Sequence, residues 1–120
     1  MVMHTVIETP GFLKEAAQYG VDEGDRTKLV ILLANHPDAG QLIVGTGGFR
    51  KLRLAGRGKG KSGGYRVITF FTGPNIPVFL ITIYSKGDRA DLSQSQRRTL
   101  LQMSKTLVAS YERKKSVKRR

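Results

Sequence analysis

Two strongly strand-forming segments in the second half of the chain constrain the fold most. Residues 65–73 read YRVITFFTG and residues 77–85 read PVFLITIYS. Both are rich in the β-branched and aromatic side chains that favour β-strands. Gly73, Pro74 and Asn75 lie between them and are typical of a turn. The two segments therefore predict adjacent antiparallel strands.

Two further segments predict strands. Residues 50–55, RKLRLA, alternate basic and apolar side chains, which points the leucines inward and Lys51 and Arg53 outward. A short apolar run precedes this strand and is broken by glycines at residues 45–48. Residues 4–8, HTVIE, form a β-branched run that predicts a first strand of the same sheet, at an edge that periodicity alone does not identify.

Three segments carry helix signals. Residues 9–20 begin with a capping threonine followed by proline, and they end at glycine. Residues 22–36 begin with acidic residues, which favour the positive end of a helix, and stop before a proline. The last helix is expected to begin at Asp91, with Gln94 completing a capping box. The expected buried residues are Phe12, Leu13, Ala16 and Tyr19, then Leu29, Leu32 and Leu33, then Leu100, Met103, Leu107, Val108 and Tyr111.

The resulting order, β-α-α-β-β-β-α, predicts one small α+β domain whose mainly antiparallel sheet packs against helices. A chain of 120 residues is long enough for a modest hydrophobic core. We assign the domain to residues 1–111. Residues 112–120, ERKKSVKRR, form a basic tail that is expected to fray or to be disordered.

The basic residues are concentrated in two places. The net charge is +12, yet residues 1–49 carry three basic and six acidic residues. Residues 50–66 carry seven basic residues and no acidic one, and residues 112–120 carry six basic and one acidic. This density favours a polyanionic partner, with nucleic acid as the leading candidate. A solubilising surface is the alternative interpretation.

Composition also limits the compartment and the chemistry. The chain has no cysteine, which excludes disulfides, thiolate zinc sites and a cysteine nucleophile. No apolar run reaches the length of a membrane span, and the N-terminal residues do not resemble a signal peptide. We therefore expect a cytoplasmic protein without a membrane partner.

The stretch GKGKS resembles the end of a nucleotide-binding P-loop, but its spacing does not fit. If Gly60, Lys61 and Ser62 ended the motif G-x-x-x-x-G-K-[ST], its first glycine would be residue 55, which is alanine. A P-loop also precedes a helix, whereas this stretch precedes a predicted strand. It is better interpreted as a basic loop that binds another phosphate, or as a disordered hairpin tip.

The histidines and carboxylates do not suggest catalysis. His4 and His36 are the two histidines, and they lie far apart in the predicted fold, so both are expected to be structural. Acidic residues are sparse beyond the N-terminal third, whereas metal-assisted phosphoryl chemistry needs several converging carboxylates. We expect no metal and no cofactor.

Cationic side chains remain as the possible catalytic groups. Arg53 and Arg66 lie on neighbouring predicted strands, Lys59 and Lys61 lie on the loop between them, and Lys86 follows the next strand. Arginine holds phosphate oxygens bidentately. Lysines in a cluster of cations can act as acid or base, because neighbouring positive charge disfavours the protonated form. These groups are expected to converge on one face of the sheet.

Three motifs from Gly45 to Gln102 carry a family resemblance: GTGGFRKLR, then GKGKSGGYR, then TIYSKGDRADL. The segment resembles the RelE/ParE superfamily of toxin–antitoxin toxins, and its HigB-like branch in particular. The resemblance implies a RelE-like fold and a metal-independent endoribonuclease that cuts mRNA in the ribosomal A site. It also implies contacts with ribosomal RNA, a helix-turn-helix antitoxin of the HigA type, and operator DNA bound only through the antitoxin complex.

The resemblance assigns roles to residues by position. Arg66 matches the strand arginine that contacts the scissile phosphate, and Lys59, Lys61 and Lys86 complete the implied catalytic set. The implied RNA-binding residues are Arg50, Lys51, Arg53, Arg57, Tyr84 and Arg89. The segment GDRADLSQ departs from many RelE-type toxins because it has no catalytic tyrosine.

Two alternatives remain open. One is a ParE-like gyrase poison, although such toxins usually lack the basic catalytic set found here. The other is a non-catalytic nucleic-acid-binding module. Few aromatic residues are left for base stacking, because Phe70, Phe71 and Phe79 are expected in the core.

Overall fold

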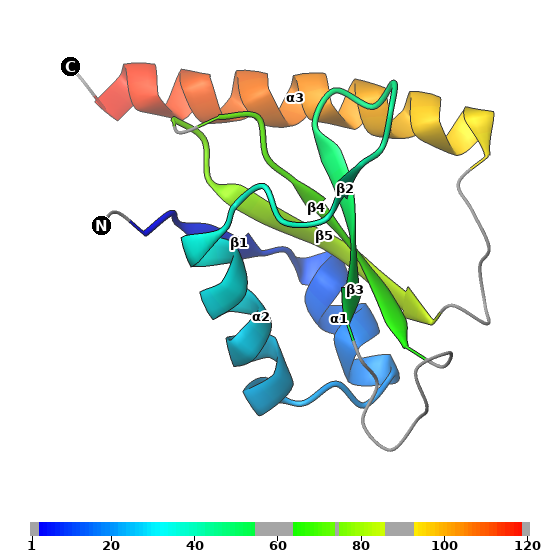
Figure 1. The fold of residues 1–120 in the computed structure, drawn as a ribbon. Coiled ribbons are helices and arrows are strands. Elements are labelled where there is room, and N and C mark those ends of the chain that lie inside the picture. The colour runs from blue at the N-terminus through cyan, green and yellow to red at the C-terminus, as the bar shows by residue number, and fades with distance from the viewer. Residues whose placement is uncertain (1–2, 55–63, 74, 86–92, 119–120) are drawn as a thin grey trace.

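The computed structural model describes residues 3–54, 64–73, 75–85 and 93–118, with side chains described as far as Tyr111. The elements, in chain order, are β1 (Val6–Glu8), α1 (Pro10–Gln18), α2 (Glu23–Asn35), β2 (Gln41–Leu42), β3 (Phe49–Leu54), β4 (Tyr65–Phe70), β5 (Val78–Ser85) and α3 (Gln94–Lys118). Figure 1 shows α1 and α2 together on one side of the sheet and α3 along the other. The predicted α+β class is confirmed.

The sheet has five strands in the order β1-β5-β4-β3-β2. β2 to β5 form a sequential antiparallel meander, and β1 occupies the other edge, parallel to β5. β1 therefore joins the sheet as expected, and the structure identifies its edge. β2 was not predicted as a strand. It has only two residues, both exposed, so it carries no alternating apolar pattern that would mark it.

One face of the sheet packs against α1 and α2. Phe12 and Ala16 of α1 and Leu29 and Leu33 of α2 are buried against Tyr65, Val67, Val78, Leu80 and Ile83 of β4 and β5. Thr9, the N-cap of α1, also donates its hydroxyl to the carbonyl oxygen of Leu80 at 2.7 Å. The cap thus fixes the start of α1 to the central part of the sheet. We call this side of the sheet the helical-pair face.

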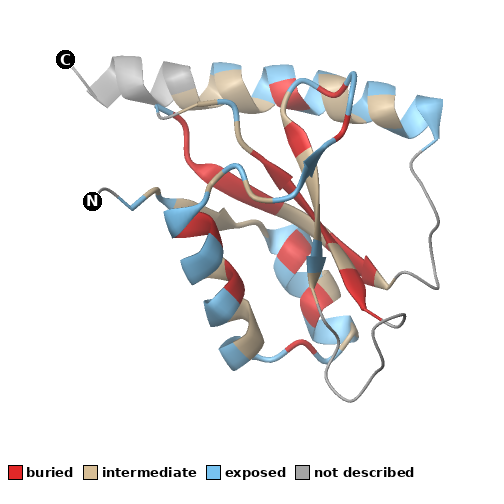
Figure 2. Ribbon diagram, in the orientation of Figure 1, coloured by how far each residue is buried: buried red, intermediate tan, exposed pale blue. Residues whose placement is uncertain are grey.

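The opposite side of the sheet packs against α3, and we call it the α3 face. Its buried cluster comprises Ile43, Phe49, Ile68, Phe70, Ile76, Phe79 and Tyr84, with Leu100, Leu107, Val108 and Tyr111 of α3 packed on it. Figure 2 shows that β4 and β5 are largely buried between these two layers. The expected burial of Phe70 and Phe79 is confirmed, and Phe71 is half-buried.

Some helix predictions need correction. Leu13, Leu32 and Met103 were expected to be buried, but each is about 40% exposed. The last helix begins at Gln94 rather than at Asp91, which lies outside the described residues. Ser93 and Gln96 form its capping box. The backbone N–H of Gln96 donates to Ser93 Oγ at 3.1 Å, and the backbone N–H of Ser93 donates to Gln96 Oε1 at 2.8 Å.

The last helix continues to Lys118, so most of the basic segment 112–120 extends α3 in this structure. Fraying of this segment, and the division of the chain at residue 111, stay predictions. No helix in the described part of the chain is long and apolar enough to span a lipid bilayer.

The glycine-rich turn before β3 has a strict requirement at Gly48. Its φ is +132°, and a Cβ there would lie 2.8 Å from Thr72 Cγ2, 3.1 Å from Phe70 Cε1 and 3.2 Å from the Phe71 carbonyl oxygen. Gly48 also accepts a hydrogen bond from the Phe71 amide. We expect Gly48→Ala to lower the free energy of unfolding by about 2 kcal/mol or more. Chemical denaturation will measure this, and Gly45→Ala, which also has positive φ but meets no atom within 4 Å, separates crowding from backbone strain.

Candidate nucleic-acid interface

The strand register brings three of the predicted site residues into one row. Arg53 of β3 pairs directly with Arg66 of β4, and Arg66 pairs with Tyr84 of β5. Residues paired in this way have side chains on the same face of the sheet. Because Tyr84 belongs to the buried cluster of the α3 face, the row lies on that face. The register therefore places Arg53 and Arg66 on one face of the sheet, as expected.

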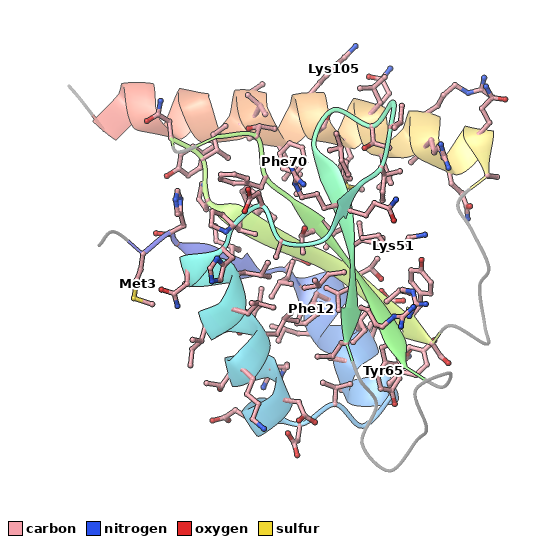
Figure 3. The ribbon with its side chains drawn as sticks, in the orientation of Figure 1. Met3, Phe12, Lys51, Tyr65, Phe70 and Lys105 are labelled. Atoms are coloured by element: carbon pink, nitrogen blue, oxygen red, sulfur yellow. The ribbon has the colours of Figure 1, made fainter. Side chains whose placement is uncertain are left out.

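Lys51 extends this row toward the start of α3. It lies two residues from Arg53 on β3, so both side chains project from the same face. Its partners are Ile68 on β4 and Gln41 on β2. In Figure 3, Lys51 points outward on the side of the molecule where α3 begins. We call Lys51, Arg53 and Arg66 the cation row.

Arg50 is separated from the cation row. As the neighbour of Lys51 on a strand, it projects from the opposite side of the sheet. Its Nη1 donates to the carbonyl oxygen of Asp38 at 3.2 Å, and its Nε is buried without a hydrogen-bond partner in the described structure. The structure therefore places Arg50 against the segment that follows α2, and not beside the other RNA-binding candidates.

Tyr84 lies on the same face as Arg66 but is buried. Only 2% of its surface is exposed, and its ring belongs to the cluster under α3. A buried ring cannot stack on a nucleotide base without moving out of the core. In this structure the Tyr84 ring therefore offers no platform on which a base could stack. A role for Tyr84 in binding RNA stays a prediction.

The cations of the row are accessible and have few local partners. Arg53 is exposed and Arg66 is half-buried. The hydrogen bond that the structure gives the Arg66 side chain is a long one, 3.4 Å from Nη1 to the carbonyl oxygen of Tyr65. The described acidic side chains belong to residues 8–38, and one of them, Glu15 of α1, accepts a hydrogen bond from the Thr82 hydroxyl of β5. Neither Arg53 nor Arg66 forms an ion pair with a carboxylate that the structure describes.

Five predicted site residues lie outside the described residues: Arg57, Lys59, Lys61, Lys86 and Arg89. Their positions in the chain still relate them to the row. The first three belong to the connection between Leu54 and Tyr65, which is the pair next to Arg53 and Arg66 in the register. Lys86 follows the last residue of β5, one position beyond the partner of Tyr65. Both connections leave the sheet at the end where the two arginines lie.

The histidines do not contribute to this surface. His4 packs edge-on against Phe71, with ring centroids 5.6 Å apart, and His36 is the exposed C-cap of α2. In the described part of the chain, no group of three histidine, aspartate or glutamate side chains is placed to hold a metal ion.

Sequence reasoning did not identify Arg97 and Arg98 as site residues. They line a hollow of about 380 Å³ between the first turns of α3 and the loop after β2, together with Val44, Gly45 and Gln94. Neither arginine forms an ion pair with another residue that the structure describes. The adjacent arginines in the sequence were the available signal, but only the tertiary packing shows that they face a hollow.

The fold and the cation row define a small basic α+β domain suited to binding phosphate groups. The family model described as the RelE toxin of the RelE/RelB toxin–antitoxin system matches residues 38–118. The chain belongs to this toxin family, as the sequence motifs predicted. It is therefore a toxin of a toxin–antitoxin system.

A solved structure supports the fold. A mutant of the Escherichia coli toxin RelE in the free state is similar to this chain with a TM-score of 0.51 and 20% sequence identity. The match covers 72% of this chain and 86% of the E. coli protein. At this identity the similarity concerns the fold, and the roles of individual residues rest on the arrangement described above.

Proposed function

We propose that this toxin is a metal-independent endoribonuclease that cuts mRNA on the ribosome, with Arg66 as the residue that holds the scissile phosphate. The observation that carries the proposal is the position of Arg66. It lies in the middle of a cross-strand row, paired directly with Arg53, and neither arginine forms an ion pair with a described carboxylate. Guanidinium groups bind phosphate oxygens through two parallel hydrogen bonds, and this geometry suits Arg66 to that role.

The proposed reaction breaks one phosphodiester bond without a cofactor. The 2′-oxygen attacks the adjacent phosphorus and loses its proton, while the 5′-oxygen leaves and gains one. The products are a 2′,3′-cyclic phosphate and a 5′-hydroxyl. Arg66 stabilises the negative charge that develops on the non-bridging oxygens. We assign proton transfer to Lys59, Lys61 and Lys86, whose connections start next to the row.

The described surface supports the proposed dependence on the ribosome. The cation row can hold a phosphate, but Tyr84 is buried, so the row offers no described aromatic ring on which a base could stack. In-line attack requires the 2′-oxygen and the leaving oxygen to be oriented on opposite sides of phosphorus. We propose that the ribosomal A site imposes this orientation on the mRNA, and that the basic surface contacts ribosomal RNA.

The proposal includes the partners and the compartment. The toxin acts in the cytoplasm, where translating ribosomes are found, and a cognate antitoxin neutralises it. We propose a HigB-like toxin with a helix-turn-helix, HigA-like antitoxin, which alone carries the complex to operator DNA. Co-expression with the gene adjacent to the toxin gene, followed by purification of the complex, tests this pairing.

A translation assay separates this function from the two alternatives. In a coupled extract programmed with a reporter mRNA, the toxin is expected to stop protein synthesis and shorten the mRNA. The rate at which purified gyrase supercoils plasmid DNA is expected to be unchanged at the same toxin concentration. Inhibition of gyrase with intact mRNA would support a ParE-like toxin instead. Reduced translation with intact mRNA, reversed by added salt, would support a binding module.

A further inference from the structure

We propose that the hollow lined by Arg97 and Arg98 is a second phosphate-binding site, which holds the RNA strand several nucleotides away from the phosphate at Arg66. This inference rests on the proposed function, because it extends the path of the same RNA. The ligand is the backbone of a single-stranded RNA. The site combines two arginines and a glutamine of α3 with Val44 and Gly45 of the loop after β2.

The packing of α3 fixes the place of this hollow relative to the sheet. Ile43 donates its amide to the carbonyl oxygen of Phe49 at 2.9 Å, so Val44 and Gly45 continue beside the start of β3. A Cβ on Gly47 would lie 2.7 Å from Ser104 Oγ and 3.1 Å from Leu101 Cδ1. The loop after β2 is therefore in close contact with α3. Arg97 and Arg98 lie about one turn before Leu101, near the N-terminal end of α3.

The cation row leads toward this hollow. Arg53 and Phe49 are four residues apart on β3, which corresponds to about 13 Å at about 3.3 Å per residue. Lys51 lies between them on the same face. A stacked strand advances about 3.4 Å per nucleotide, so phosphates held at the two ends would be roughly four nucleotides apart. A continuous RNA strand could follow Arg66, Arg53, Lys51 and then the hollow.

The local charge suits a phosphate. Arg97 is half-buried and Arg98 is exposed, and neither forms an ion pair with a residue that the structure describes. Val44 is 74% exposed at the rim, so the hollow opens to solvent. Two positive charges that line one hollow repel each other, and an anion bound between them offsets this repulsion. These features favour a polyanionic strand over an uncharged ligand.

Binding of a non-cleavable RNA to the full-length toxin tests the site separately from cleavage. The probe is a fluorescent 2′-O-methyl RNA of about ten nucleotides, long enough to reach both groups and lacking the attacking hydroxyl. We expect the R97Q/R98Q variant to bind about tenfold more weakly than wild type. The slope of log affinity against log salt is expected to fall by about 1.4, because each single-strand phosphate contact contributes about 0.7.

The matched control is the K28Q/K105Q variant, which removes the same number of positive charges elsewhere. Lys28 is exposed on α2, and Lys105 is exposed on α3 and points away from the sheet in Figure 3. For this variant, we expect the slope of log affinity against log salt to stay within about 0.5 of the wild-type slope. Equal losses in the two variants would overturn the proposal, because net charge alone would then explain both. Circular dichroism will establish that both variants are folded.

Two further outcomes distinguish the possible failures. If a ten-residue poly-glutamate peptide binds wild type as tightly as the RNA and also depends on Arg97 and Arg98, the hollow is a protein-docking site and the proposal is wrong. If RNA binding changes as expected but no ribosome-bound mRNA is cut, the phosphate site stands and the proposed enzymatic function fails. If mRNA is cut normally and R97Q/R98Q binds RNA like wild type, the function stands and this site is overturned.

Discussion

Replacing Arg66 with alanine is expected to slow cleavage of ribosome-bound mRNA by about 100- to 1000-fold, as removal of a single donor to developing negative charge does in other enzymes. The side chain projects from the sheet beside that of Arg53 and makes one long hydrogen bond to a described residue. Its removal therefore leaves no buried group without a partner. We expect the free energy of unfolding to change by less than about 1 kcal/mol.

Single-turnover cleavage on programmed ribosomes and urea denaturation of the same protein preparation measure the two effects. Arg66→Lys keeps the charge but loses the bidentate fork, so its rate is expected between those of wild type and the alanine variant. Lys28→Ala removes an exposed cation from the other layer and should cut at the wild-type rate. An Arg66→Ala protein that is folded and fully active would remove Arg66 from the proposed mechanism.

Replacing Phe70 with alanine is expected to reduce stability more than any exposed substitution proposed here. Phe70 is fully buried on the α3 face, and its ring lies 4.8 Å from that of Phe49 and 6.2 Å from that of Phe79, between ring centroids. Its removal would leave a cavity at the contact between the sheet and α3. We expect a loss of about 3–5 kcal/mol, a large part of the stability of a small domain.

Thermal and urea denaturation will measure this loss, and Phe70→Leu provides the control, because it keeps most of the buried volume. We expect the leucine variant to lose clearly less stability than the alanine variant. Ribosome-dependent cleavage should fall only in proportion to the unfolded fraction. If Phe70→Ala is as stable as wild type, the described packing of α3 on the sheet is wrong.

Much of the fold could be predicted because its signals are local. The β-branched segments at residues 65–73 and 77–85, with a glycine-proline turn between them, predicted the hairpin of β4 and β5. The alternation of residues 50–55 predicted which side chains of β3 point inward. Together these placed Arg53 and Arg66 on neighbouring strands of a meander, and the structure shows that the two residues pair directly.

Other features could not be predicted because they depend on tertiary contacts. Alternation predicts the face on which Tyr84 lies, but not whether a helix covers that face. The start of α3 was ambiguous because two overlapping capping boxes were possible, from Asp91 to Gln94 and from Ser93 to Gln96. The separation of Arg50 from Lys51 follows from the strand period, which the family resemblance alone did not take into account.

The hollow beside Arg97 illustrates the same limit. Its residues come from two segments about 50 positions apart in the chain, which the packing of Gly47 against Ser104 brings together. No local pattern in either segment indicates this contact. The glycines before β3 were a signal of unusual backbone, yet only the structure shows that they allow α3 to approach the loop.

The central claim is tested most directly by primer extension on a defined mRNA in a translating extract, with the same mRNA free of ribosomes as the control. The account predicts cuts at fixed positions within codons, seen only with ribosomes, without added metal, and lost with Arg66→Ala. Cuts in ribosome-free mRNA at the same sites, or the same cuts with Arg66→Ala, would contradict it.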